Sequence, residues 1–283
     1  MAEFYVVATP IGHLADITAR ALDVLGRVTT VYCEDTRHTH RLLDHHGIRT
    51  RCAALHRHNE RAAIEKLIAQ LAAGESVAYV SDAGTPGISD PGARAVAAVR
   101  AAGYPVVPLP GACAAVTAFS AAGLPDERFL FVGFLPSKTQ ARRSELIHLK
   151  DVAAALVFYE APHRVADTLD DLAELYEPQR TLVVARELTK CFEQIVSLPI
   201  TEGPAWLAAD DDRRRGEFVL IVSHPPPRQG LAESDERLLR LLLAEVPLKQ
   251  AVRIAECIAG GSRKLLYARA LELQAEVTPC PPD

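Results

Sequence analysis

Short apolar runs alternate with longer amphipathic segments along most of the chain. Residues 4–8, 28–33 and 77–80 are largely apolar, which is typical of parallel strands that are buried on both faces. A helical pattern follows each run, and the first helical pattern starts after Asp16, a residue type that favours a helix N-cap. Strands that alternate with helices of this length predict βαβ units and a mostly parallel sheet.

The alternation starts again after an alanine-rich helical segment at residues 112–122. Further strand patterns follow at residues 129–134, 155–159, 181–185 and 217–222. Residues 192–198 alternate apolar and polar positions, which indicates an antiparallel strand. The pattern therefore predicts an N-terminal α/β domain over residues 1–111 and a C-terminal α/β domain over residues 112–223.

The last part of the chain differs in composition from both predicted domains. Residues 224–233 form a linker that three consecutive prolines stiffen. A helical tail is predicted over residues 234–278, with two of its helices hinged at Gly260-Gly261.

Composition fits a globular protein of this organisation. The 283 residues leave room for two domains and a small appendage, and 49% hydrophobic with 24% charged residues is ordinary. No apolar run approaches the roughly 20 residues that a membrane-spanning helix needs. The net charge of −5 argues against a broadly basic nucleic-acid surface but leaves room for a local basic patch.

Cysteine usage and the N-terminus indicate a cytoplasmic location. The six cysteines are scattered and form no C-x-x-C pair, which favours reduced thiols over a disulfide framework or a zinc site. The chain enters its first strand pattern without a signal sequence.

The loop at residues 81–92 contains more turn chemistry than a simple strand-to-helix connection needs. Its three glycines let the backbone approach a ligand closely, and its two prolines stiffen the loop. Open α/β sheets bind ligands at such loops, beyond the carboxyl ends of parallel strands. We therefore expect this loop to line a ligand site, with a surface turn that binds nothing as the alternative.

Polar clusters recur where the predicted strands end. They lie at residues 9–12, 34–37, 81–92, 110–111, 160–164 and 186–190. Each cluster alone fits a cap or a turn. Together, at strand ends in two sheets, they predict a ligand-binding cleft between the domains.

The common phosphate-binding and hydrolase motifs are absent from the sequence. Neither a G-x-G-x-x-G after the first strand, nor a G-x-x-x-x-G-K-[ST], nor a G-x-S-x-G elbow occurs. Six of the ten histidines fall between His38 and His58, spread over a helix and a later strand end. This spread predicts surface and loop histidines and no metal site.

Basic residues gather in three places. These are Lys138, Arg142 and Arg143; Arg213-Arg214-Arg215; and Lys249, Arg253, Arg263, Lys264 and Arg269. The tail, with a Gly-Gly turn between helices, is similar to small helical units that bind nucleic acid. Acidic residues are interleaved with the basic ones, so RNA contact and a solvated face of a packing appendage both stay open.

Six motifs in the chain stand in a characteristic order. They are Ala8-Thr9-Pro10-Ile11-Gly12, Glu34-Asp35-Thr36-Arg37, His58-Asn59-Glu60, residues 81–92, Phe158-Tyr159-Glu160-Ala161-Pro162-His163-Arg164 and Arg186-Glu187-Leu188-Thr189-Lys190. Together they resemble the bacterial small-subunit ribosomal RNA 2′-O-methyltransferases of the tetrapyrrole methylase superfamily, and the resemblance covers essentially the whole chain.

This resemblance implies two α/β domains of tetrapyrrole-methylase type, with S-adenosylmethionine in the cleft between them, and a homodimer. The implied reaction is 2′-O-methylation of a cytidine in the decoding centre of 16S rRNA, with the small ribosomal subunit as the partner. The implied cofactor contacts are Pro10, Ile11, Gly12, Asp82, Ala83, Gly84, Thr85, Pro86, Pro110, Gly111, Ala112, Cys113, Phe158, Tyr159, Ala185 and Phe218. His13 and Cys113 depart from the family pattern, which carries Asn and Ser there, and the second departure alters one expected cofactor contact.

Methyl transfer to a ribose hydroxyl requires alignment of oxygen, methyl and sulfur, and loss of the hydroxyl proton. We expect carbonyl oxygens around the methyl group and a carboxylate on the hydroxyl side. The catalytic candidates are Glu160, Glu187 and Asp35, with Arg164, Arg186 and Arg37 holding a phosphate or orienting the acids. Each acid could equally be a structural partner of its neighbouring arginine. The candidate RNA contacts are Arg37, Lys138, Arg142, Arg143, Lys249, Arg253, Arg263 and Lys264.

Two other functions use the same fold. One is methylation of a tetrapyrrole of the precorrin type, and the basic helical tail argues against it because a small porphyrinoid needs no such arm. The other is a non-catalytic ribosome-binding factor, and the intact loop at residues 81–92 argues against it.

Overall fold

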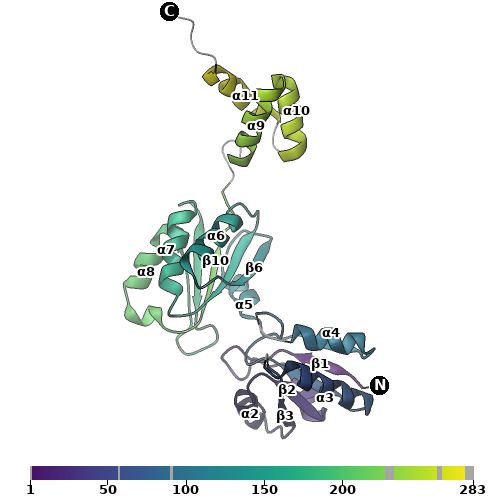
Figure 1. The fold of residues 1–283 in the computed structure, drawn as a ribbon. Coiled ribbons are helices and arrows are strands. Elements are labelled where there is room, and N and C mark those ends of the chain that lie inside the picture. Colours follow the sequence, from purple (N-terminus) through teal and green to yellow (C-terminus); the bar gives the residue numbers. More distant parts are fainter. Residues whose placement is uncertain (1, 57, 90–91, 227–232, 260–262, 278–283) are drawn as a thin grey trace, which may run out of the picture. The chain divides into compact units, whose positions relative to one another are not determined.

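The computed structural model describes residues 2–56, 58–89, 92–226, 233–259 and 263–277 (Figure 1). Its contacts divide the chain into two units, Met1–Pro225 and Pro226–Asp283. Most of the predicted linker, residues 227–232, lies outside the described residues, as does the predicted hinge at Gly260-Gly261. Within the described ranges, no helix is long and apolar enough to span a bilayer.

The first sheet is parallel throughout, with the strand order β3-β2-β4-β1-β5. Its strands are β1 (Phe4–Val7), β2 (Thr30–Cys33), β3 (Arg51–Ala54), β4 (Val77–Val80) and β5 (Val106–Leu109). Successive side chains point to opposite faces, so Tyr5 and Val7 pack in one core layer and Phe4 packs in the other. One layer contains α1 (Ala19–Arg27) and α2 (Thr36–His45), and the other contains α3 (Glu60–Ala72) and α4 (Ala93–Ala101).

Helix α1 begins later than the sequence pattern predicts. Thr18 is its N-cap, because Thr18 Oγ1 accepts a hydrogen bond from Ala21 N at 3.1 Å. The prediction of Asp16 as the cap is wrong. Both residue types cap helices well, so local preference does not choose between them.

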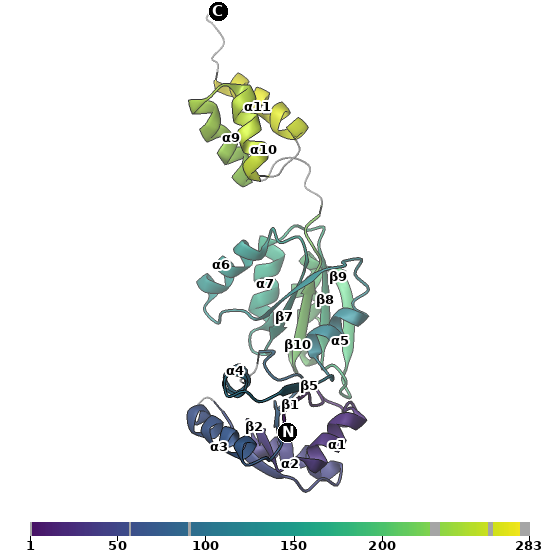
Figure 2. The same cartoon turned by 90° about the vertical axis from the view of Figure 1, so that its right-hand side faces the viewer.

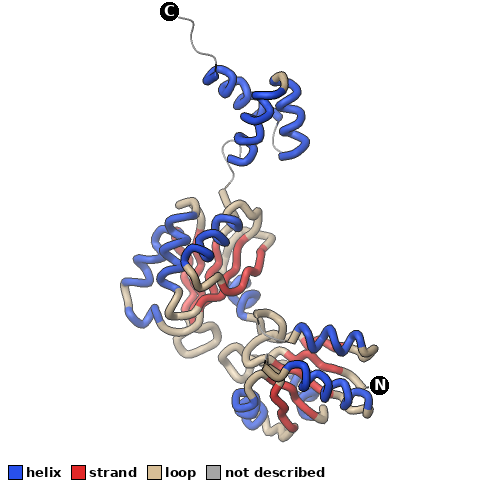
Figure 3. The backbone as a smooth tube through the Cα atoms, viewed as in Figure 1, coloured by secondary structure: helices blue, strands red, loops and turns tan. Residues whose placement is uncertain are grey.

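The second sheet is mixed, with the order β6-β7-β10-β8-β9. Its strands are β6 (Phe129–Phe134), β7 (Ala155–Glu160), β8 (Thr181–Arg186), β9 (Gln194–Pro199) and β10 (Phe218–Val222). Strand β6 runs parallel to β7, whereas the last strand, β10, inserts antiparallel between β7 and β8. The antiparallel strand predicted at residues 192–198 is confirmed as β9. Figure 3 shows the two sheets as separate groups of strands.

Helices cover the second sheet unequally. Helices α6 (Thr139–Leu149), α7 (Val165–Leu175) and α8 (Gly203–Ala208) pack on one face, and α5 (Ala114–Ala121) packs on the other (Figure 2). Two 3-10 turns, η1 (Ile200–Glu202) and η2 (Asp211–Arg214), flank α8. We call the part around the first sheet the first lobe and the part around the second sheet the second lobe.

The second unit is helical and has its own small core. It contains α9 (Glu233–Glu245), α10 (Leu248–Ala259) and α11 (Arg263–Val277), which bury Leu239, Val252 and Leu266 among others. Glu236 on α9 accepts hydrogen bonds from Arg269 on α11 and from Arg240, each at 2.8 Å. The Arg269 and Arg240 guanidiniums lower the pKa of Glu236 to about 2, so this link between helices stays charged at neutral pH.

A buried ion pair attaches α6 to α7. Arg142 Nε donates to Asp171 Oδ2 at 2.6 Å, and the two side chains are only 3% and 7% exposed. Arg143 donates to the other Asp171 oxygen at 2.8 Å and also pairs with Glu174. The prediction that Arg142 contacts RNA is wrong, because its guanidinium is enclosed in this pair.

We expect Asp171→Asn to lower the free energy of unfolding by on the order of 3 kcal/mol, because among the described residues the buried Arg142 guanidinium then keeps just the exposed Asp167 carboxylate, 3.8 Å away, as an acidic partner. The adjacent Asp170 is exposed, so Asp170→Asn should change the stability by less than about 0.5 kcal/mol. Urea unfolding of both variants measures the difference. Equal loss of stability in the two variants would contradict a structural role for the pair.

Candidate active site

A short bridge joins the carboxyl ends of β1 and β4. Thr9 N donates to Gly84 O at 2.9 Å, and Gly84 N donates back to Thr9 O at 3.0 Å. Gly84 has a φ of +77°, and a Cβ at this position would lie 3.3 Å from Ile11 Cγ2. Ser81 Oγ also donates to Gly84 O at 2.9 Å. The loop after β4 is therefore fixed against the loop after β1.

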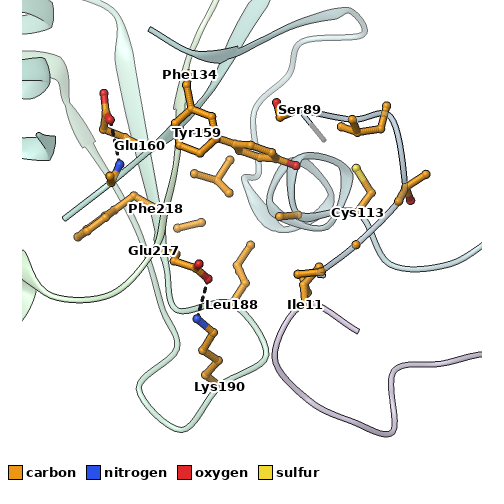
Figure 4. Close-up of a pocket in the computed structure, with 18 of the residues that line it drawn as sticks. Ile11, Ser89, Cys113, Phe134, Tyr159, Glu160, Leu188, Lys190, Glu217 and Phe218 are labelled. Carbon is orange, nitrogen blue, oxygen red and sulfur yellow. Dashed lines mark hydrogen bonds and ion pairs between the residues drawn. The ribbon is translucent and has the colours of Figure 1, made fainter. Parts of the chain in front are cut away.

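A cavity of about 310 Å³ lies between this bridge and the second lobe. Such a volume falls within the range of sites for small organic ligands, roughly 300–1,000 Å³. The first lobe contributes Ile11, Ala83, Gly84, Thr85, Ile88 and Ser89. The second lobe and the segment that leads into it contribute Cys113, Ala114, Phe134, Tyr159, Glu160, Ala161, Pro162, Ala185, Leu188, Lys190, Glu217, Phe218 and Val219 (Figure 4). We call this space the interlobe cavity.

Many of the predicted cofactor residues line the interlobe cavity. They are Ile11, Ala83, Gly84, Thr85, Cys113, Tyr159, Ala185 and Phe218. Pro86, Pro110, Gly111 and Ala112 are not among its described lining residues. Two of these support the wall from behind: Ala112 O accepts a hydrogen bond from Thr85 Oγ1 at 2.9 Å, and Gly111 packs against Ala8 so closely that a Cβ would lie 2.6 Å from Ala8 Cβ.

The Phe158 side chain points away from the interlobe cavity. Neighbouring residues on a strand face opposite sides of the sheet. Phe158 is therefore buried in the core under α6 and α7, whereas Tyr159 faces the cavity. Ala115 N donates to the Tyr159 hydroxyl at 3.1 Å. The predicted cofactor contact at Phe158 therefore cannot use its side chain.

Cys113 is the N-cap residue of α5, and its side chain accepts no capping hydrogen bond. A Ser at this position would be a better capping residue. The departure from the family pattern at Cys113 therefore weakens the start of a helix beside the cavity, in addition to changing the cavity wall.

A second cavity of about 520 Å³ adjoins the first at the ends of β1 and β4. It is lined by Thr9, Pro10, Ile11, Gly12, Leu14, His38, Thr39, Arg41, Leu42, Ser81, Asp82, Ala83 and Lys190. The predicted cofactor residues Pro10, Gly12 and Asp82 lie here. Ile11, Ala83 and Lys190 line both cavities, so the two spaces meet at these side chains. We call this space the strand-end cavity.

Glu160 is held as a structural partner. Its side chain is fully buried and accepts hydrogen bonds from Ala161 N and Thr168 Oγ1, both at 2.8 Å (Figure 4). Arg164 Nε lies 3.2 Å from the same carboxylate, at an angle too poor for a hydrogen bond, and Arg164 also donates to Leu135 O. The structure therefore favours the structural interpretation of Glu160 and Arg164 over the catalytic one.

Asp35 is the N-cap of α2. Its carboxylate accepts a hydrogen bond from Arg37 N at 2.8 Å and from the Arg37 guanidinium at 2.6 Å. The hydrogen bonds from Arg37 hold the pKa of Asp35 well below its usual range. A carboxylate with so low a pKa is a weak proton acceptor, which argues against Asp35 as the general base.

Arg186 is buried and uses its guanidinium on the backbone. Its nitrogens donate to Arg215 O and Asp212 O at 2.7 Å each, and to Phe192 O at 3.3 Å. The structure favours a structural role for Arg186 over phosphate binding, because the residue is 8% exposed and each of its three nitrogens donates to a carbonyl. Arg186 instead ties the loop after β8 to the loop before β10.

Lys190 lies between two carboxylates. Lys190 Nζ donates to Glu187 Oε1 and to Glu217 Oε2, both at 2.8 Å (Figure 4 shows the second contact). Burial raises the pKa of Glu187, but hydrogen bonds from Lys190 and from Glu217 N outweigh it, and this pKa lies below its ordinary value. Burial lowers the pKa of Lys190, but hydrogen bonds to Glu187 and Glu217 outweigh it, and this pKa lies above its ordinary value.

Lys190 is the last residue of one of the strand-end motifs, but the sequence pattern did not predict a role for it. Glu217 is the first residue of the strand predicted at residues 217–222, and in the structure it directly precedes β10. Ile88, Ser89 and Phe134 line the interlobe cavity without a sequence signal of their own. The pairing of Lys190 with Glu217 joins residues far apart in the chain, and local pattern does not predict it.

The basic residues proposed for RNA divide into exposed and enclosed ones. Arg37, Lys138, Lys249, Arg253, Arg263 and Lys264 are exposed, and Arg143 is partly exposed beside Asp171. Their contact with RNA stays a prediction. Across the described ranges, no group of three or more His, Cys, Asp or Glu side chains is arranged to hold a metal ion.

Two family profiles match the chain. The profile described as Tetrapyrrole (Corrin/Porphyrin) Methylases matches residues 3–203, and the profile described as RsmI C-terminal HTH domain matches residues 229–274. A Ribosomal RNA small subunit methyltransferase I of Pseudomonas aeruginosa is 49% identical over 275 residues, which cover 96% of this chain and 98% of that relative. The protein of the same name from Escherichia coli O157:H7 is 50% identical over 273 residues, 96% of each chain.

Solved structures share the fold of the two lobes. The methyltransferase CobJ superposes with a TM-score of 0.60 at 21% identity, over 81% of this chain and 97% of that chain. A uroporphyrin-III C-methyltransferase from Thermus thermophilus, complexed with S-adenosyl homocysteine, gives a TM-score of 0.55 at 17% identity, over 79% and 97% of the two chains. With the profile match and the full-length relatives, these likenesses lead to one conclusion. The chain belongs to the tetrapyrrole methylase family.

Proposed function

We propose that this protein transfers a methyl group from S-adenosylmethionine to small-subunit ribosomal RNA, at the ribose 2′-hydroxyl of a cytidine in the decoding centre. The observation that carries the methylation of ribosomal RNA is the near full-length identity of about half to relatives named for it. The assignment of the 2′-hydroxyl and of a cytidine as the methylated position rests on the motif resemblance alone.

The interlobe cavity suits S-adenosylmethionine chemically. Ile11, Tyr159 and Leu188 give apolar walls for an adenine ring, and Thr85 and Ser89 give hydroxyl groups for polar parts of the ligand. Glu217 places a carboxylate in the same wall, which favours a positively charged ligand. Bound there, the cofactor supplies an activated methyl group.

The strand-end cavity is our candidate site for the target nucleotide. A reacting oxygen must come within about 3–3.5 Å of the methyl group, so the ribose must enter from space that adjoins the interlobe cavity. The strand-end cavity shares Ile11, Ala83 and Lys190 with it. His38, Thr39 and Arg41 add polar and basic side chains that suit a nucleotide.

The rival functions fit fewer observations. A tetrapyrrole methyltransferase would use the same two lobes, but the full-length relatives named for ribosomal RNA include the helical unit as well. A non-catalytic ribosome-binding factor would not need the open interlobe cavity or the bridge at Gly84.

The proposal includes a homodimer that works in the cytoplasm on the assembled small subunit. Val116 on α5 and Phe129 on β6 are exposed apolar side chains, and they support an association of two copies. Exposed basic residues of α10 and α11 support RNA contact by the helical unit.

We expect Ala83→Leu to weaken binding of S-adenosylmethionine by about 10-fold or more, because the larger side chain fills space where both cavities meet. Ala83 is exposed in the structure, so its enlargement should leave the fold intact. Titration calorimetry measures the affinity. Ala72→Leu, at an exposed position of α3, is the matched control, and similar affinities of the two variants would contradict the proposed site.

We expect small-subunit RNA treated with the protein to become resistant to alkaline cleavage on the 3′ side of one cytidine. The 2′-hydroxyl is the nucleophile in that cleavage, and a methyl group on it removes the nucleophile. Primer extension or sequencing after partial hydrolysis locates the protected position. Incorporation of labelled methyl groups without a protected position would place the methyl group on a base and contradict the 2′-hydroxyl.

We expect the double variant Arg263→Ala/Lys264→Ala to bind RNA less tightly and to lower the slope of log affinity against log salt by about one for each lost phosphate contact. A filter-binding series across salt concentrations measures the slope. Arg61→Ala/Lys66→Ala, two exposed basic positions on α3, is the control. An unchanged slope in the first variant would show that these two side chains make no phosphate contacts and belong to a solvated face.

A further inference from the structure

We infer that Lys190 and Glu217 together control the proton of the attacking ribose hydroxyl, with Lys190 as hydrogen-bond donor to the oxygen and Glu217 as proton acceptor. This inference rests on the proposed function and deepens it. Neither residue was assigned a catalytic role by the sequence motifs.

Lys190 stands where the two cavities meet. It lines the interlobe cavity and the strand-end cavity, and among the described lining residues of the interlobe cavity it is the one cationic side chain. A hydroxyl that approaches the methyl group from the strand-end cavity must therefore pass beside Lys190.

Contacts from both lobes hold Lys190 at this junction. The main chain of Gly12 lies so close to the lysine stem that a Cβ on Gly12 would sit 2.6 Å from Lys190 Cγ. Next to Gly12, His13 N donates to Thr189 Oγ1 at 3.1 Å, which joins the same two segments. Glu187, with a φ of +52°, turns its carboxylate back onto Lys190 Nζ. The lysine is thus held in one position before any substrate binds.

The two carboxylates that contact Lys190 differ in accessibility. The Glu187 side chain is 17% exposed, and its Oε1 accepts hydrogen bonds from both Lys190 Nζ and Glu217 N. The Glu217 side chain is 79% exposed, and Lys190 is the one partner that the described residues give it. Glu187 is therefore a positioning residue, whereas Glu217 can reach a substrate hydroxyl.

The charge of Lys190 decides which member of the pair accepts the proton. Its ammonium stays protonated near neutral pH, because hydrogen bonds to both carboxylates raise its pKa in spite of burial. A protonated lysine donates a hydrogen bond and stabilises negative charge on the ribose oxygen, but it accepts no proton. The proton acceptor is then a carboxylate, and Glu217 is the accessible one.

The step assigned to the protein is balanced. The O–H bond of the ribose breaks, its proton forms a bond with a Glu217 carboxylate oxygen, and its electron pair stays on the ribose oxygen, which forms the new bond to the methyl carbon. The bond between that carbon and sulfur breaks with its electron pair going to sulfur. Glu217 then releases its proton to water.

The test compares Glu217→Gln, Lys190→Met and Lys190→Arg with the wild type in single-turnover methylation at saturating cofactor. We expect Glu217→Gln and Lys190→Met to lower the rate by about 100-fold or more, the usual effect of lost general acid–base catalysis. Lys190→Arg should recover part of the rate, because it keeps the charge. Affinity for S-adenosyl homocysteine, measured by calorimetry, should change by less than about threefold, which corresponds to less than about 0.7 kcal/mol of binding free energy.

The pH dependence separates a proton acceptor from a structural residue. The wild-type rate should be independent of pH on the alkaline side, because a carboxylate of the protein takes the proton. The Glu217→Gln rate should rise about tenfold per pH unit, because hydroxide must then remove the proton. Glu202→Gln, at an exposed position of the second lobe, is the control and should behave as the wild type.

Three results would overturn the inference. If the Glu217→Gln variant has the wild-type rate and pH profile, Glu217 is not the proton acceptor. Loss of S-adenosyl homocysteine binding or of thermal stability in parallel with the rate makes the pair structural. A wild-type protein that binds the cofactor but methylates no small-subunit RNA removes the proposed function, and the inference with it, whereas the first two results leave the proposed function standing.

Discussion

The main chain at Gly12 packs against the turn that carries Leu188 and Lys190, and the arrangement of both cavities depends on this contact. A side chain on Gly12 would collide with Lys190, Thr189 and the Leu188 carbonyl, so the absence of a Cβ lets the two lobes touch here. The bridge between Thr9 and Gly84 fixes the loop on the other side of Ile11. Together they leave one space between the lobes and a second space at the strand ends, separated by three side chains.

Most charged residues near the strand ends serve the structure. Asp35 caps α2, Glu160 accepts hydrogen bonds from Thr168 and Ala161, and Arg186 binds three carbonyls. In each case the hydrogen bonds give a partner to a charge or a backbone group that would be costly to bury unpaired. The same chemistry that makes a residue look catalytic in a sequence also makes it a good structural partner. What distinguishes Glu217 is that its carboxylate stays accessible beside the cavity.

The two units contribute differently to the proposed function. The lobes share their fold with methyltransferases, and a fold by itself does not determine the substrate, so the choice of RNA depends on other features of the chain. The helical unit matches a separate profile and has its own core. Its exposed basic residues and the polar strand-end cavity are the parts on which the choice of an RNA substrate would depend.

The local sequence pattern determined the order of strands and helices. Parallel strands that are buried on both faces are continuously apolar, whereas helices that are buried on one face are amphipathic. It also located the functional edge, since loops rich in glycine and proline follow strands where the sheet binds ligands. The loop at residues 81–92 and the motif that ends in Lys190 were both visible in this way. The antiparallel insertion of β10 was not visible, because strand order depends on pairing between distant segments.

Tertiary structure alone decided which side chains reach the site. Phe158 and Tyr159 are adjacent in the sequence, but the alternation of the strand sends one into the core and the other to the cavity. Arg142 looks like a surface cation until Asp171 on the next helix encloses it. Lys190 and Glu217 acquire a joint role only because β8 and β10 are neighbours in the sheet, and the sequence by itself fixes the residue types but not that neighbourhood.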